Sequence, residues 1–316
     1  LYAFREALGQ TAGGGIDAAE ILGVLSLMIW ALILVVTVKY VSFLMRADNN
    51  GEGGVLSLMA LAKRATGGWK SVIALGAVGA ALFYGDAIIT PALSVRRAAA
   101  AAEADFTPAF AAGFAVAAGF DGTVSSRFGL MPIALAILVG LFAIQSRGTA
   151  NVSRLFGPVC AIWFLTIGAL GLLHLYDAPS ILLAFNPSLG VSFLLQHGMT
   201  GLFVLGAVFL TVTGAEALTA DMGHFGRLPI KLGWFLLVFP SLVLNYLGQG
   251  AFALAQLGEA TAAGKAFANA DWFFLMAPEP VRPWVVVIAT LATIIASQAV
   301  ITGAYSLTQQ AISLGL

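Results

Sequence analysis

A series of long, nearly uninterrupted apolar segments constrains this chain more than any other feature. Most are about as long as the ~20 residues that a helix needs to cross a bilayer. They are continuous and do not alternate with a period of two, which excludes a membrane β-barrel. Only 9% of the 316 residues are charged, against about 25% in a soluble domain. The sequence therefore predicts an all-α polytopic membrane protein.

About eight helices are expected, the first of them truncated. Residues 1–9 have the pattern of the end of a first helix, and the remaining spans are expected at residues 20–45, 70–96, 128–146, 155–176, 198–221, 230–256 and 283–312. If the loop 44–70 is cytoplasmic, nine basic residues fall on that side and six on the other, as the positive-inside rule favours. The chain starts without Met and ends in an apolar run, so we expect a fragment of a longer transmembrane domain.

Two acidic residues, Asp86 and Glu216, lie deep inside these apolar runs. Each costs about 2.5–3.5 kcal/mol at the centre of a membrane helix, a cost usually met where an ion or proton pathway needs the group. Asp86, Thr90 and Ser94 are spaced to share one helical face, and Thr213 and Glu216 are spaced to share another. Carboxylates and hydroxyls are hard ligands for cations, and a buried carboxyl can also take up a proton. The alternative is a structural role, with the acids hydrogen-bonded between helices.

Several other function classes find no support. Basic and acidic residues cancel, so no net field attracts nucleic acid. The calcium-like loop that starts at Asp48 has Met59 where a glutamate is required. The phosphate-loop-like segment 258–265 has the wrong length and is followed by Ala266. No Cys/His spacing suits zinc, and no nucleophile motif suggests hydrolysis. We therefore expect no enzyme and no cofactor.

Longer polar motifs within the apolar sequence point to one family. They occupy residues 46–54 (RADNNGEGG), 83–92, 145–158, 213–226, 245–250 (NYLGQG) and 296–301 (ASQAVI). In this order they resemble the motifs of the KUP/HAK/KT potassium uptake transporters, of the APC superfamily, along nearly the whole chain.

The resemblance implies a LeuT-like inverted-repeat fold, incomplete here because the C-terminal helices and the cytoplasmic domain are absent. It implies low-affinity K+ uptake across the inner (plasma) membrane by K+/H+ symport with alternating access. K+ and H+ are then the transported ions, and the lipid bilayer is the other partner. The implied K+ ligands are Tyr2, Asp86, Thr90, Ser94, Thr213 and Glu216, with Glu216 and Asp86 also coupling protons. The sequence leaves a homodimer open.

Three other readings stay open at this stage. A LeuT-fold transporter of amino acids or another small solute would use the same architecture. A channel-like K+ pathway is a second alternative, although no Thr-Val-Gly-Tyr-Gly filter is present. A purely structural membrane subunit is the third, and two deep acids with neighbouring hydroxyls argue against it.

Overall fold

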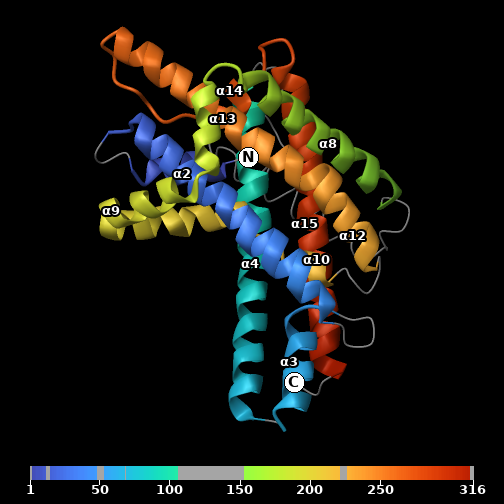
Figure 1. Cartoon of the computed structure of the whole chain (residues 1–316). Helices are drawn as coiled ribbons and strands as arrows, with labels where there is room; N and C mark the ends of the chain where they lie inside the picture. The colour runs from blue at the N-terminus through green and yellow to red at the C-terminus, as the bar shows by residue number, and fades with distance from the viewer. Residues whose placement is uncertain are drawn as a thin grey trace, which may run out of the picture. The chain divides into compact units, whose positions relative to one another are not determined.

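The computed structural model describes residues 2–11, 15–47, 53–67, 69–105, 153–220 and 226–313, shown in Figure 1. The expected helix 128–146 and most of the 46–54 motif lie outside these ranges. The chain divides into two compact units, which are described one by one. Unit 1 comprises residues 1–46, 164–218 and 225–277, and unit 2 comprises residues 47–163, 219–224 and 278–316.

The described residues form helices, with no strand among them. Within the described ranges, six helical segments are long and apolar enough to cross a membrane: Ala18–Arg46, Lys70–Ala87, Phe156–His174, Pro187–Thr211, Arg227–Ala262 and Arg282–Ser313. The prediction of an all-α polytopic protein is therefore confirmed.

Unit 1 begins with α1 (Ala3–Gly9) and α2 (Ala18–Ala31). A capping box starts α2, because Asp17 accepts a hydrogen bond from the Glu20 amide and Glu20 accepts one from the Asp17 amide. The helix then widens into the π-helical segment η1 (Leu32–Phe43) and ends in a 3-10 turn, η2 (Leu44–Arg46). Wide helical turns of this kind are rare and frequently occur at functional sites.

The second part of unit 1 contains α8, η3 and the helical stretch that ends in α13 and α14. The helix α8 (Ser153–His174), whose residues from 164 onward belong to this unit, is followed by the 3-10 segment η3 (Pro179–Phe185). Later in the chain, α12 (Arg227–Gly233), the π-helical η5 (Trp234–Val238) and α13 (Phe239–Ala262) follow one another without a break. The short α14 (Trp272–Leu275) ends the unit. The Trp234 indole donates a hydrogen bond to Thr37 Oγ1 at 3.0 Å and so joins η5 to η1.

Glycines let α8 and α13 approach backbone to backbone. A Cβ added to Gly171 would lie 2.2 Å from the Leu244 carbonyl oxygen, and one added to Gly248 would lie 2.4 Å from the Gly171 Cα. A Cβ added to Gly168 would lie 3.1 Å from the Ser241 Oγ. Small residues at such crossings are typical of membrane helix packing.

The helix α9 (Pro187–Val208) departs from the expected span 198–221, because it starts earlier and is broken. Asn186 caps its start by accepting a hydrogen bond from the Ser188 amide, with Pro187 at the first helical position. Gly198, at φ 51 and ψ −117, separates two arms of α9. A Cβ on Gly201 would lie 3.2 Å from the Leu194 Cα, so the arms pack side by side, as Figure 1 shows.

Unit 2 contains α3 (Val55–Ala65), α4 (Lys70–Asp105) and α15 (Arg282–Ser313). Their buried apolar side chains form one cluster: Leu56, Met59, Phe83, Ala87, Val300 and Leu307. The hydroxyl of Tyr84 bonds to Thr308 Oγ1 and to the Ala304 carbonyl, which ties α4 to α15. The helix α4 runs past the expected end at residue 96 because the alanine-rich stretch that follows favours helix.

Candidate functional site

The segment that carries Thr213 and Glu216 is not a regular helix. After α9 the chain forms a single 3-10 turn, η4 (Phe209–Thr211), then turns through residues 212–216 before α10 (Ala217–Ala220). Successive i to i−3 hydrogen bonds run from the amides of Val212, Ala215 and Leu218. Gly214 has a φ of 79°, a value that residues with a side chain rarely adopt. The expected continuous helix over 198–221 is therefore wrong at the position of the candidate ligands.

The shared helical face expected for Thr213 and Glu216 is lost with this helix. Thr213 is exposed, and its hydroxyl donates to the Leu210 carbonyl at 3.1 Å. Glu216 is half-buried. A non-helical segment flanked by helices is where transporters of broken-helix design place ion ligands, because side chains and main-chain groups are both available there.

Glu216 has a neighbour that sequence reasoning missed. Its carboxyl and the half-buried hydroxyl of Tyr40 on η1 lie close enough to interact electrostatically. The Lys39 ammonium lies 4.9 Å from the centre of the Tyr40 ring, within the range of a cation–π interaction. The only hint in the sequence is a tyrosine beside a lysine near the end of an apolar run.

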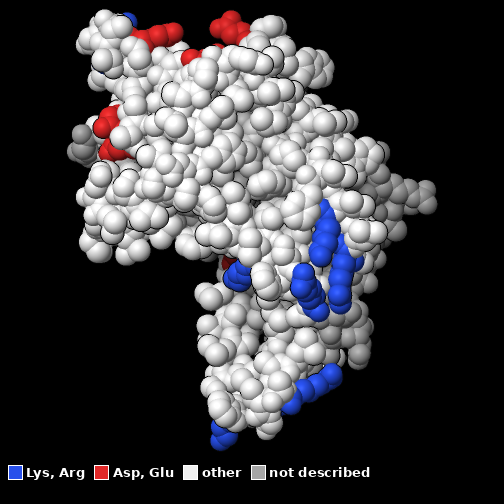
Figure 2. All heavy atoms as spheres, in the orientation of Figure 1, with Lys and Arg blue, Asp and Glu red and all other residues white. Residues whose placement is uncertain are grey.

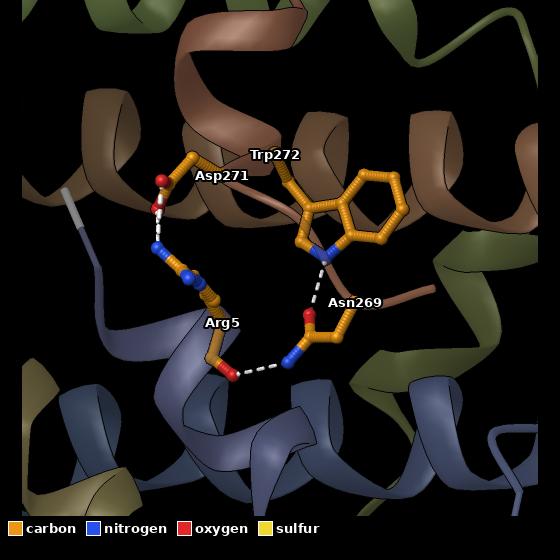
Figure 3. A network of polar contacts seen from close by, with 4 residues as sticks. All are labelled: Arg5, Asn269, Asp271 and Trp272. Carbon is orange, nitrogen blue, oxygen red and sulfur yellow. Dashed lines mark hydrogen bonds and ion pairs between the residues drawn. The ribbon is translucent and has the colours of Figure 1, made fainter. Parts of the chain in front are cut away.

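Tyr2 stands at the start of α1, and a polar network holds this helix in place (Figure 3). A single guanidinium nitrogen of Arg5, Nη1, donates to both carboxylate oxygens of Asp271, each at 2.6 Å. Asn269 donates to the Arg5 carbonyl at 2.8 Å and accepts from the Trp272 indole at 3.0 Å. These bonds fix α1, and with it the Tyr2 backbone, against the segment that leads into α14.

On α13, Tyr246 is buried. Asn245 and Gln249 on the same helix are buried as well. The sequence analysis does not predict these three residues as ligands, although they belong to the NYLGQG motif. Two amide side chains in an apolar run are the sequence signal that could have identified them.

The other three candidates lie in unit 2 on the single helix α4. Asp86 is half-buried and follows the core residue Phe83 by one turn. The backbone at Thr90 and Ser94 continues this helix, so the three positions keep the i, i+4, i+8 spacing. The structure thus brings Asp86, Thr90 and Ser94 onto one helix, whereas Tyr2, Thr213 and Glu216 belong to unit 1.

Many charged side chains of unit 1 gather in two regions, although Arg5 lies among the acidic ones, paired with Asp271. Figure 2 shows acidic side chains over the region of α13 and α14 and basic side chains over the region of α12. Arg227 and Lys231 lie on α12, whereas Glu259 and Asp271 lie near the far end of α13 and before α14. The polar ends of a membrane unit are expected to differ in this way.

The comparisons with known proteins agree with these features. A family profile described as "K+ potassium transporter integral membrane domain" matches residues 1–316. The chain belongs to this potassium transporter family. The resemblance to the KUP/HAK/KT transporters is thereby confirmed, and the chain is a multi-pass protein of the cell membrane.

Individual relatives of this family are close in sequence. The chain is 65% identical to "Probable potassium transport system protein Kup 2" of Novosphingobium aromaticivorans over 317 aligned positions, which cover 100% of this chain and 48% of the relative. It is 63% identical to "Probable potassium transport system protein Kup 1" of Rhizorhabdus wittichii, with 100% and 47% covered. The corresponding Kup protein of Caulobacter vibrioides is 58% identical, with 100% and 46% covered. The chain thus spans about half the length of these relatives, and no solved structure matches it.

Proposed function

We propose that the protein to which this chain belongs takes up K+ by secondary active transport, as a K+/H+ symporter with alternating access. The observation that carries the proposal is the broken segment 209–216, which interrupts an apolar helical stretch and bears Thr213 and Glu216. Family membership supplies the substrate class, since the relatives are named as potassium transport proteins. The broken helix supports a LeuT-like inverted-repeat architecture, in which discontinuous helices line the ion site.

In this proposal, oxygens of Tyr2, Thr90, Ser94 and Thr213 replace water around K+, and Asp86 and Glu216 supply negative charge. Glu216 is the preferred proton carrier because it combines partial burial with a neighbouring phenol hydroxyl, that of Tyr40. Protonation of such a carboxyl removes the charge that holds the cation, so uptake of one ion becomes linked to the other. The basic region around α12 would then face the cytoplasm.

The test uses the full-length protein in proteoliposomes, with Rb+ as the tracer for K+ and an imposed proton gradient. We expect Glu216→Gln and Asp86→Asn to abolish proton-driven uptake. Glu259→Gln is the matched control, because Glu259 is exposed near the end of α13, and it should transport normally. If Glu216→Gln and Asp86→Asn both restore growth of potassium-starved cells that lack other uptake systems, the site assignment is wrong.

A further inference from the structure

Basic residues stand at the ends of two apolar segments of unit 1. Arg46 is the last residue of the segment Ala18–Arg46, and Arg227 is the first residue of the segment Arg227–Ala262. Lys231 follows Arg227 by one turn of α12. Figure 2 shows basic side chains gathered over the region of α12. Because the ends of membrane spans lie at the depth of the lipid headgroups, these cations are placed where the phosphate groups of a bilayer lie.

The two apolar segments pack antiparallel to each other, as two contacts show. Near one end, the Trp234 indole on η5 donates to Thr37 Oγ1 on η1 at 3.0 Å. Further along, a Cβ added to Gly250 on α13 would meet the side chain of Leu25 on α2. Residue numbers therefore rise along one segment as they fall along the other.

All three cations consequently lie beyond the Trp234–Thr37 bond, toward the same end of the pair. Lys231 and Arg227 precede Trp234 by three and seven residues, whereas Arg46 follows Thr37 by nine. At about 1.5 Å per residue, Lys231, Arg227 and Arg46 lie roughly 4.5, 10.5 and 13.5 Å from the bond along the helix axes. Arg227, Lys231 and Trp234 also share one helical face, because their spacing is i, i+4, i+7. Since Trp234 on that face reaches Thr37, we call Arg46, Arg227 and Lys231 the basic cluster.

The segments that carry the basic cluster do not themselves explain its charge. Residues 32–47 and 226–238 contain no acidic residue. A cation in the first turn of a helix is unfavourable, so Arg227 does not stabilise α12. Lys39 is not counted in the cluster, because it lies over the ring of Tyr40. An anion from outside these segments would balance the positive charge.

Exposed apolar side chains border the basic cluster. Phe43 is exposed three residues before Arg46, whose guanidinium carbon lies 6.0 Å from the centre of the Phe43 ring. Leu228, Leu232 and Phe235 are exposed along α12 and η5. A free anion uses only the cations, whereas a phospholipid also covers apolar surface with its acyl chains. The combination of cations and exposed apolar surface favours a lipid.

We propose that Arg46, Arg227 and Lys231 bind the headgroup phosphate of an anionic phospholipid, whose acyl chains lie along Phe43, Leu228 and Leu232. Anionic lipids of the cytoplasmic leaflet attract basic residues next to membrane spans, which agrees with the orientation in which the α12 region faces the cytoplasm. A lipid bound to residues of both segments joins them at this end and so stabilises unit 1.

The experiment uses the full-length protein in detergent after removal of bound lipid. Phosphatidylglycerol is titrated in, and the rise of the thermal unfolding midpoint gives an apparent Kd. Phosphatidylcholine with the same acyl chains should have little effect, because it carries no net charge. Loss of one cation should weaken phosphatidylglycerol binding about fivefold, so Arg46→Gln, Arg227→Gln and Lys231→Gln together should weaken it about a hundredfold.

Lys265→Gln is the matched control, because Lys265 is exposed just after the opposite end of α13, and it should bind phosphatidylglycerol as the wild type does. Equal responses to the two lipids, or undiminished binding by the triple variant, would overturn the site. Inorganic phosphate that raises the midpoint as much as phosphatidylglycerol would also overturn it, since no lipid is then needed. If the triple variant does not fold, the three single variants decide, and an unchanged Kd in all of them contradicts the proposal. No step of this test involves K+ uptake, so failure of the proposed function would not affect its outcome.

Discussion

The contact between α8 and α13 predicts a large effect of one added methyl group. In Gly171→Ala the new Cβ would lie 2.2 Å from the Leu244 oxygen, 2.4 Å from the Leu244 carbonyl carbon and 2.6 Å from the Asn245 nitrogen. All three are main-chain atoms, so no side-chain rotation relieves the clash and the two helices must separate. Overpacking costs about 1–3 kcal/mol, and a clash with rigid backbone belongs at the upper end, about 3 kcal/mol. Since proteins are stable by only about 5–15 kcal/mol, this loss is readily measured.

The assay is thermal unfolding of the full-length protein in detergent, followed by circular dichroism. The matched control is Gly206→Ala, at an exposed position of α9 where no described atom lies within 4 Å of the added Cβ. That substitution should stabilise the helix by about 0.5–1 kcal/mol. Gly248→Ala enters the same contact from the other helix, so the double substitution should cost less than the sum of the two single ones. Equal unfolding midpoints for Gly171→Ala and Gly206→Ala would refute the close approach of α8 and α13.

Three further substitutions test other parts of the structure. Gly214→Ala should cost about 1–2 kcal/mol from backbone strain alone, since Gly214 has φ 79 and no described atom lies within 4 Å of the added Cβ, whereas Gly214→Asn should cost less. The unfolding midpoints of the two variants check this, and a midpoint for alanine at or above that of asparagine would contradict it. Asp17→Ala removes the cap of α2 and should lower stability by about 1 kcal/mol in the same assay. An unchanged midpoint would argue against the cap. Arg5→Met breaks the pair with Asp271, and because both side chains are partly exposed it should cost less than about 1 kcal/mol and lose its effect in high salt. A large, salt-independent loss would mean that the pair is not exposed as described.

The sequence predicts the long helices well because their apolar length is a direct requirement of the bilayer. Residues 70–96, 155–176 and 283–312 lie almost entirely within α4, α8 and α15. The ends are less predictable. For α4 the span ends where apolar residues end, whereas the helix continues because alanine and glutamate favour helix outside the bilayer too.

Breaks inside an apolar run are where sequence reasoning fails. Hydropathy does not distinguish Gly198 and Gly214, which turn the chain, from Gly206, which lies in regular helix. The first arm of α9, residues 187–197, is about 16 Å long at 1.5 Å per residue, about half of the hydrocarbon thickness. The second arm, residues 199–208, is about 15 Å long by the same measure, so neither arm crosses the hydrocarbon layer alone.

The candidate ligands divide along the same line. The spacing of Asp86, Thr90 and Ser94 is predictable because the helix there is regular. Thr213 and Glu216 were expected to share one helical face. They do not, because the positive φ of Gly214 interrupts the helix between them. Tyr40 was missed because its proximity to Glu216 joins segments far apart in the chain, which leaves no local pattern in the sequence.

The 3-10 and turn geometry of residues 209–216 has a consequence for genetic experiments on this protein. Its carbonyl oxygens belong to the peptide chain itself, so every allele retains them. If a cation binds to residues 209–216, replacing one side chain removes only the contact that this side chain makes. The carbonyl oxygens of the main chain remain. Scanning mutagenesis across the segment should therefore yield graded rather than all-or-none defects, and the most severe alleles should be those that change the path of the chain.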